Sequence, residues 1–119
     1  LCYGSDVYLG ESIAVHEFAH TIKSMGLVFL DSNFTTTVEN AYQNARNQGL
    51  WDNTYAGSNA EEYWAEGVQS YFNTNLQSDP PNGIHNHVNT RAELQAYDPG
   101  LYALIDEVFD GVVYTPTCP

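Results

Sequence analysis

The sequence has few basic residues, only two cysteines and no long apolar run. Lys23, Arg46 and Arg91 are the only Lys and Arg residues, against fifteen Asp and Glu, and the formal net charge of the 119 residues is −12. Without a cluster of Lys and Arg, a chain cannot neutralise phosphates or hold to an anionic membrane, so we expect no nucleic-acid partner and no membrane partner. No apolar run approaches the roughly 20 residues of a membrane-spanning helix. With 43% hydrophobic and 13% aromatic residues, the chain is nevertheless typical of a folded acidic domain.

The two cysteines, Cys2 and Cys118, lie at opposite ends of the sequence. A disulfide between them would close nearly the whole chain into one loop and stabilise it by about 4–5 kcal/mol in the chain-entropy model, and two free thiols are the alternative. The chain begins at Leu1 and shows no signal-peptide pattern, and Asn33-Phe34-Thr35 forms an N-glycosylation sequon. Together these features predict a secreted protein with a candidate glycosylation site at Asn33.

The periodicity of the sequence predicts a mainly α single domain over residues 1–119, which is a whole protein or a fragment of a larger secreted one. We expect a monomer. A short β piece is expected at Val7–Leu9 and helices at 11–25, 35–48, 58–75, from 90 onward and at 98–110. Their boundaries rest on Gly26 and Gly49 as stops and on Asp98-Pro99 as a start, and on three capping-box pairs: Thr36 with Glu39, Ser58 with Glu61, and Thr90 with Glu93.

Residues 16–20 read His-Glu-Phe-Ala-His, the pattern that carries the strongest chemical signal. On a helix, His16 and His20 lie one turn apart on the same face, so that both imidazoles can reach one metal ion. Glu17 lies beside that face, where it can take a proton from a water molecule. The opposite arc is apolar and is expected to be buried; it contains Ala14, Val15, Phe18, Ala19 and Ile22. A surface helix with two unrelated histidines is the alternative.

A catalytic zinc ion takes three protein ligands and leaves one position open, so a third ligand is needed. Glu62 and Glu66 are four residues apart on the predicted third helix and share one of its faces. We assign Glu62 to the metal and Glu66 to the histidine His16, since metal-bound histidines usually donate their second N–H to a carboxylate. The alternative is that these carboxylates are solvated helix charges.

The combination of HExxH with a later helical ExxAE, here Glu62 to Glu66, resembles the gluzincin zinc metallopeptidases. The 42-residue separation from His20 to Glu62 makes the chain look like the zinc domain of anthrax lethal factor and like the Pro-Pro endopeptidases. The resemblance covers roughly residues 10–72 and implies a zincin-like helical core that binds one Zn²⁺ through His16, His20 and Glu62. It further implies Glu17 as the general base and Tyr55, seven residues before Glu62, as a group that stabilises the transition state.

The chain departs from these enzymes in one respect. They place a β-sheet before the metal-binding helix and use its edge strand to hold the peptide substrate. Here only ten residues precede the predicted helix, so that this strand is reduced to Val7–Leu9, lies elsewhere or belongs to sequence outside this chain.

His85 and His87 are the two remaining histidines. Three interpretations are open: they stabilise the transition state from the wall of a cleft, they contact substrate, or they are polar loop residues. We expect them to be neighbours of the site rather than ligands, because the zinc already has three.

The leading prediction is therefore a secreted zinc endopeptidase that acts on a peptide or protein substrate. A zinc hydrolase or lyase acting on another bond is an alternative, because metal chemistry does not name the bond that is cleaved. A non-catalytic module held together by zinc is a second alternative, and it would be favoured by a fourth protein ligand from His85 or His87.

Overall fold

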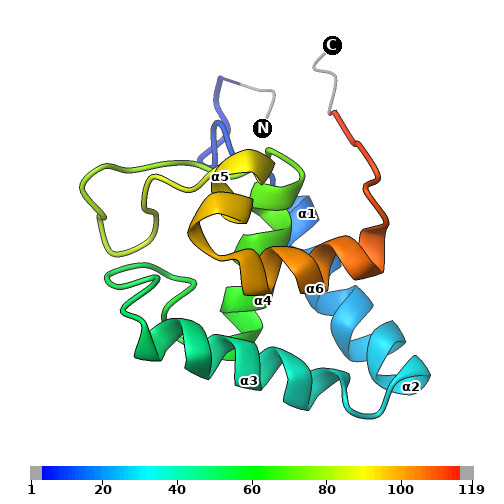
Figure 1. Cartoon of the computed structure of the whole chain (residues 1–119). Coiled ribbons are helices and arrows are strands. Elements are labelled where there is room, and N and C mark those ends of the chain that lie inside the picture. The colour runs from blue at the N-terminus through cyan, green and yellow to red at the C-terminus, as the bar shows by residue number, and fades with distance from the viewer. Residues whose placement is uncertain (1–3, 116–119) are drawn as a thin grey trace.

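The chain folds into helices and the loops that join them (Figure 1). The computed structural model describes residues 4–115, and no strand occurs among them. Its elements are α1 (Ile13–Ile22), the π-helical turn η1 (Lys23–Leu27), α2 (Val28–Leu30), α3 (Phe34–Asn47), α4 (Ala60–Tyr71), α5 (Arg91–Tyr97) and α6 (Pro99–Phe109). The predicted mainly α fold class is confirmed. No helix in this part of the chain is both long and apolar enough to pass through a bilayer.

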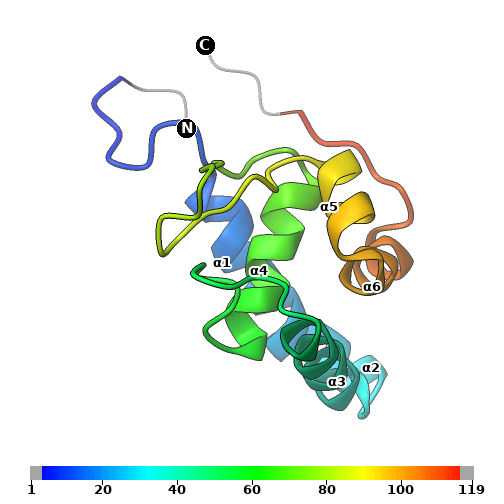
Figure 2. The same ribbon diagram turned by 60° about the vertical axis from the view of Figure 1, so that its left-hand side comes forward.

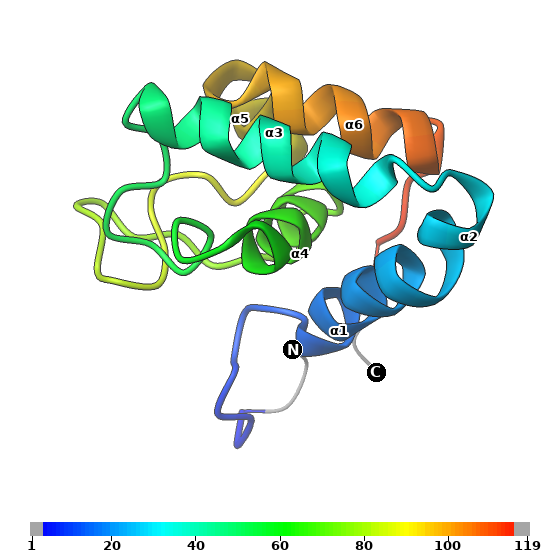
Figure 3. The same ribbon diagram turned by 90° about the horizontal axis from the view of Figure 1, so that it is seen from below.

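Helix α4 forms the centre of the molecule. It packs against α1 on one side and against α3, α5 and α6 on the other, an arrangement that the view along the layers in Figure 3 shows. Every residue from Tyr63 to Tyr71 is buried, as expected for a helix that is covered on both sides. The carboxylates of Glu62 and Glu66 are thus attached to the most buried helix of the described chain.

Hydrogen bonds at both ends of α1 fix it alongside α4 (Figure 2). The Trp64 indole N–H donates to the Ala19 carbonyl at 3.0 Å, and the Gln69 amide donates to the Ser12 carbonyl at 3.3 Å. The Ser12 N–H in turn donates to the Thr74 carbonyl at 2.8 Å. These bonds set the depth and rotation of α1, and with them the direction of its two histidines.

The β piece predicted at Val7–Leu9 is wrong. These residues form turns, closed by a hydrogen bond from the Glu11 N–H to the Tyr8 carbonyl and by Gly10, whose φ is +92°. No other strand exists among the described residues to pair with them, and an isolated strand is unstable in water.

Two of the three predicted capping boxes are also wrong. Asn59, not Ser58, caps α4, and its side chain accepts from the Glu62 N–H at 2.9 Å, while Glu61 pairs with the buried Lys23. Helix α3 begins two residues before Thr36. The Thr90–Glu93 box of α5 and the Asp98-Pro99 start of α6 are confirmed.

The stop predicted at Gly26 does not occur, because the chain continues through η1 and α2. The face of α1 turned away from α4 is also less covered than predicted. Ala19 is buried, but Phe18 is 55% exposed, and Met25, Phe29 and Leu30 farther along are exposed too. Within residues 4–115, this side of the molecule carries an apolar surface.

Candidate metal centre

Three side chains meet between α1 and α4. His16 and His20 come from α1 and Glu62 from the first turn of α4. The two Nε2 atoms are 3.1 Å apart, and Glu62 Oε2 lies 2.9 Å from Nε2 of His16 and 3.5 Å from Nε2 of His20. With Zn–N and Zn–O bonds near 2.0–2.1 Å, a tetrahedral zinc ion separates its donor atoms by roughly 3.3 Å. The donor set and its spacing therefore fit a zinc ion, as the HExxH and ExxAE motifs predict.

A second layer of contacts orients His16. Its Nδ1 donates to Gln69 Oε1 at 2.7 Å and lies 3.3 Å from Glu66 Oε1. The Gln69 amide nitrogen is bonded to Ser12, so the amide oxygen must face the imidazole. With its proton on Nδ1, the neutral ring offers the Nε2 lone pair to a metal ion.

The environment of His16 raises its pKa although the ring is buried. Burial alone lowers the pKa, but the hydrogen bonds to Glu66 and Gln69 and the charges of Glu66 and Glu62 outweigh it and bring the pKa to about 9. In the metal-free protein, a proton is therefore a strong competitor for this site at neutral pH.

Glu66 occupies the place that the sequence predicts for it, next to His16. Asn75 holds its other oxygen, with the amide N–H donating to Oε2 at 3.0 Å. Gln69 and Asn75 are absent from the sequence-based site. A signal for Gln69 exists, because Glu62, Glu66 and Gln69 follow the i, i+4, i+7 spacing of one helix face. Nothing in the sequence indicates Asn75, which lies beyond the end of α4.

Glu17 and Tyr55 lie in a cleft that is also lined by His16, one of the three candidate ligands. The cleft has a volume of about 480 Å³, and its walls also include Glu66 and His85. Glu17 is exposed to solvent, which the base role predicted for it requires. The Tyr55 ring is stacked near that of His16, with centroids 6.1 Å apart, and is 43% exposed. The partial burial of the phenol and the nearby Glu62 carboxylate raise the pKa of Tyr55 above its ordinary value, so the hydroxyl stays protonated and can donate a hydrogen bond.

The loop before α4 fixes Tyr55 at this place. The Tyr55 N–H donates to the Ile84 carbonyl at 2.8 Å, and its carbonyl accepts from both the N–H and the hydroxyl of Ser58. Gly57 allows the loop to close, since a Cβ there would lie 2.2 Å from the Trp51 carbonyl oxygen. The backbone of Tyr55 is thus held by Ile84 and Ser58, while its side chain contacts His16 and Glu62.

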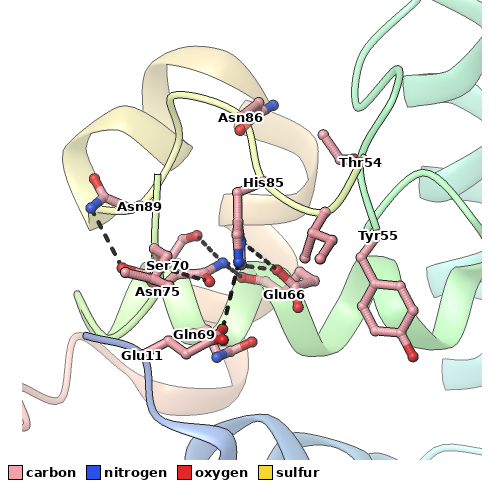
Figure 4. A network of polar contacts seen from close by, with 12 residues as sticks. Glu11, Thr54, Tyr55, Glu66, Gln69, Ser70, Asn75, His85, Asn86 and Asn89 are labelled. Carbon is pink, nitrogen blue, oxygen red and sulfur yellow. Dashed lines mark hydrogen bonds and ion pairs between the residues drawn. The ribbon is translucent and has the colours of Figure 1, made fainter. Parts of the chain in front are cut away.

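The structure separates the two remaining histidines. His85 is buried in the cleft wall and points toward Glu66 and Glu11, as Figure 4 shows. His87 is exposed, and its ring packs edge-on against Tyr97, outside the cleft. Neither histidine belongs to the only group of three or more His, Cys, Asp and Glu in the described part of the chain whose geometry suits a metal ion.

The remaining predicted residues lie elsewhere. Asn33 is exposed at the N-terminus of α3, and its side chain makes no capping hydrogen bond. Cys2 and Cys118 lie outside the described residues, so that their pairing stays a prediction.

No protein-family model matches this sequence, and neither the curated proteins nor the solved structures contain a significant match to it. The resemblance to gluzincin peptidases therefore remains an interpretation of the motifs.

Proposed function

We propose that this chain is the catalytic domain of a zinc-dependent peptidase. The observation that carries the proposal is the convergence of His16, His20 and Glu62 at zinc-ligand spacing, with a carboxylate and a phenol in the adjoining cleft. A group of three ligands leaves a fourth position for solvent or substrate, which is the arrangement of catalytic rather than structural zinc.

Each residue has a distinct role in this proposal. A zinc ion held by the three ligands would polarise the scissile carbonyl and lower the pKa of water. Glu17 accepts the proton of the attacking water and delivers it to the leaving amine. The Tyr55 hydroxyl donates a hydrogen bond to the oxygen of the carbonyl as its negative charge develops. Glu66 and Gln69 keep the His16 ring in its orientation.

The alternative of a non-catalytic zinc module would be favoured by a fourth protein ligand, because structural zinc sites usually have four. His85 faces Glu66 and Glu11, and His87 packs on Tyr97, so neither supplies one. This module would also leave the exposed Glu17 beside the metal without a role.

The proposal is tested with zinc content and peptide hydrolysis measured on the same preparations. We expect about one zinc ion per chain and cleavage of a fluorogenic peptide library by the wild type. Glu17→Gln should retain the zinc and lose activity by about 10²–10⁴-fold, the usual contribution of a general base. Glu107→Gln is a matched control with the same change of charge, at an exposed residue of α6.

Near wild-type turnover by Glu17→Gln would remove this residue from the mechanism, and absence of bound zinc would refute the metal centre. Cleavage of esters or glycans without any cleavage of peptides would favour the alternative zinc hydrolase.

We further propose that the protein is secreted, on the basis of Cys2, Cys118 and the sequon. The exposure of Asn33 suits glycosylation. When the chain is produced through a eukaryotic secretory pathway, Asn33→Gln should abolish a mass shift that a glycosidase removes. An unmodified wild-type chain would contradict the prediction at Asn33.

A further inference from the structure

One wall of the cleft contains three buried ionisable groups that the proposed mechanism leaves largely unused. Glu11, immediately before α1, is 8% exposed, Glu66 on α4 is 5% exposed and His85 is 8% exposed. They come from three separate segments and meet at the side of the cleft shown in Figure 4.

These groups face one another without forming hydrogen bonds. His85 Nε2 lies 3.8 Å from Glu11 Oε2, and His85 Nδ1 lies 4.0 Å from Glu66 Oε2. Nδ1 of His85 is the one fully buried side-chain nitrogen or oxygen without a partner in the described part of the chain. Buried polar atoms are almost always paired in folded proteins, so an unpaired one in a cleft wall points to a ligand.

The chemistry of the wall selects a cationic donor. With the His85 proton on Nε2, the nitrogen that faces Glu11, Nδ1 is an acceptor beside the Glu66 carboxylate. The cleft wall contains three carboxylates, those of Glu11, Glu17 and Glu66, and no Lys or Arg. An anion would be repelled here, whereas an ammonium group would gain charge-assisted hydrogen bonds.

The spacing also suits an ammonium group. Two acceptors that each lie about 2.9 Å from one tetrahedral nitrogen are roughly 4–5 Å apart, close to the separation of His85 Nδ1 and Glu66 Oε2. Exposed apolar groups stand at the same cleft, where Tyr8 and Ile84 are 50% and 53% exposed. They can cover the methylene groups of a lysine side chain while its charged end reaches the carboxylates.

We propose that Glu11, Glu66 and His85 form a subsite for a primary ammonium group of the peptide substrate. The inference rests on the proposed function, because it places this group of the peptide next to the metal centre. A lysine side chain and the free α-amine of a peptide share the required chemistry, and the experiment separates these two sources.

The test measures binding rather than hydrolysis, on Glu17→Gln protein with and without zinc. Three nine-residue Ala/Gly/Ser peptides are compared by calorimetry, and each carries one central variable residue. The first is blocked at both ends and carries lysine, the second has a free α-amine and carries norleucine, and the third is blocked and carries norleucine. We expect one of the first two to bind about tenfold or more tightly than the third, and the tighter of them identifies the source of the ammonium group.

A second variant connects this preference to the subsite. Adding Glu11→Gln, which keeps the shape of the side chain and removes its charge, should reduce the preference to less than about threefold, whereas adding Glu107→Gln should leave it unchanged. Thermal unfolding of both double variants verifies that the fold is intact. Equal binding of the three peptides overturns the subsite, and so does a preference that survives Glu11→Gln in the folded protein. Failure of the wild type to cleave any peptide would instead refute the proposed function, and the binding comparison would remain readable.

Discussion

Tyr55 is the residue of the proposed mechanism that lies on a loop rather than on α1 or α4. The loop holds its backbone through Ile84 and Ser58, and the side chain reaches the metal centre with 43% of its surface still exposed. In the proposed reaction, a group held in this way would already be placed toward the charge that develops, at little cost in reorganisation.

Tyr55→Phe should therefore lower kcat by about a hundredfold and leave zinc content and the melting temperature unchanged. The phenyl ring preserves the stacking on His16, and only the hydroxyl donor is lost. Steady-state kinetics with parallel metal analysis test this, and Tyr102→Phe on α6 is the matched control. Equal kcat values for the wild type and Tyr55→Phe would exclude a role of the hydroxyl in the reaction.

The raised pKa of His16 makes both metal binding and stability depend on pH. The folded, metal-free protein holds the His16 proton up to about pH 9, whereas an unfolded histidine releases it near pH 6.5. The resulting stabilisation is complete below about pH 6.5 and is lost as the pH rises through about 9. Zinc must displace the same proton, so its binding strengthens over this range.

We expect the apparent zinc affinity to increase by up to about tenfold per pH unit between pH 6.5 and 8.5, as measured by competition with a chromogenic chelator. The free energy of unfolding of the metal-free protein should fall over the same interval, by a few kcal/mol at most. His87→Gln, at an exposed histidine, should show the same dependence. An affinity that does not change with pH would contradict the raised pKa.

At the scale of the elements, the spacing of the HExxH and ExxAE motifs predicts that α1 packs against α4. It does not predict how far one helix is shifted or rotated relative to the other. His16, His20, Glu62 and Glu66 lie on helix faces that the sequence indicates directly. The contacts that bring these faces together are hydrogen bonds from Trp64 and Gln69 to the backbone carbonyls of α1 and its N-cap. The helix spacing places Gln69 on the same face as Glu62 and Glu66, but it does not indicate which carbonyl its amide contacts.

The sequence predicts a helix boundary well where one local capping interaction decides it, and poorly where several residues can form the cap. Asp98-Pro99 starts α6 because the fixed φ of proline and the aspartate cap act together. Ser58 and Asn59 both suit a cap of α4, and the pairing of Glu61 with Lys23 leaves Asn59 in that role. The helical backbone does not end at Gly26 but continues through η1 and α2, where Lys23 pairs with Glu61 and Leu27 packs against the core.

The contact of α4 with α6 depends on the missing side chain of Gly67. A Cβ at this position would lie 2.5 Å from Leu101 Cδ2 and 2.9 Å from Ile105 Cδ1, and both of these residues are fully buried. Gly67→Ala gains about 1 kcal/mol of helix propensity, but the overpacking of a filled core costs about 1–3 kcal/mol. We expect a net loss of about 1 kcal/mol in urea unfolding.

Gly100→Ala on α6 is the matched control, because a Cβ there would lie 3.5 Å from the nearest atom, an ordinary contact. This substitution should be neutral or slightly stabilising. Equal stabilisation by both substitutions would contradict the prediction, because it would show that Leu101 and Ile105 move aside for a Cβ at Gly67 at little cost.

At the scale of the whole molecule, the net charge of −12 is distributed so that several carboxylates converge on the metal centre. Glu17, Glu62 and Glu66 gather around two histidines, and Glu11 lies behind them. Carboxylates confined in one region repel each other, and a bound cation offsets that repulsion because it attracts each of them. Zinc should therefore contribute to the stability of the entire fold, because its ligands connect α1 to the central helix α4.

Removal of the metal should accordingly lower the melting temperature of the whole domain. At a free zinc concentration about 1,000 times the dissociation constant, the bound ion stabilises the folded state by about 4 kcal/mol. For a domain of this size that corresponds to a shift of roughly 10–20 °C on addition of a chelator, measured by calorimetry. His20→Ala should melt at the same temperature with and without the chelator, because it lacks one of the three ligands, whereas Glu107→Gln should respond like the wild type. A wild-type melting temperature that the chelator does not change would show that no ion connects α1 to α4, and the proposed catalytic role of the site would then fail as well.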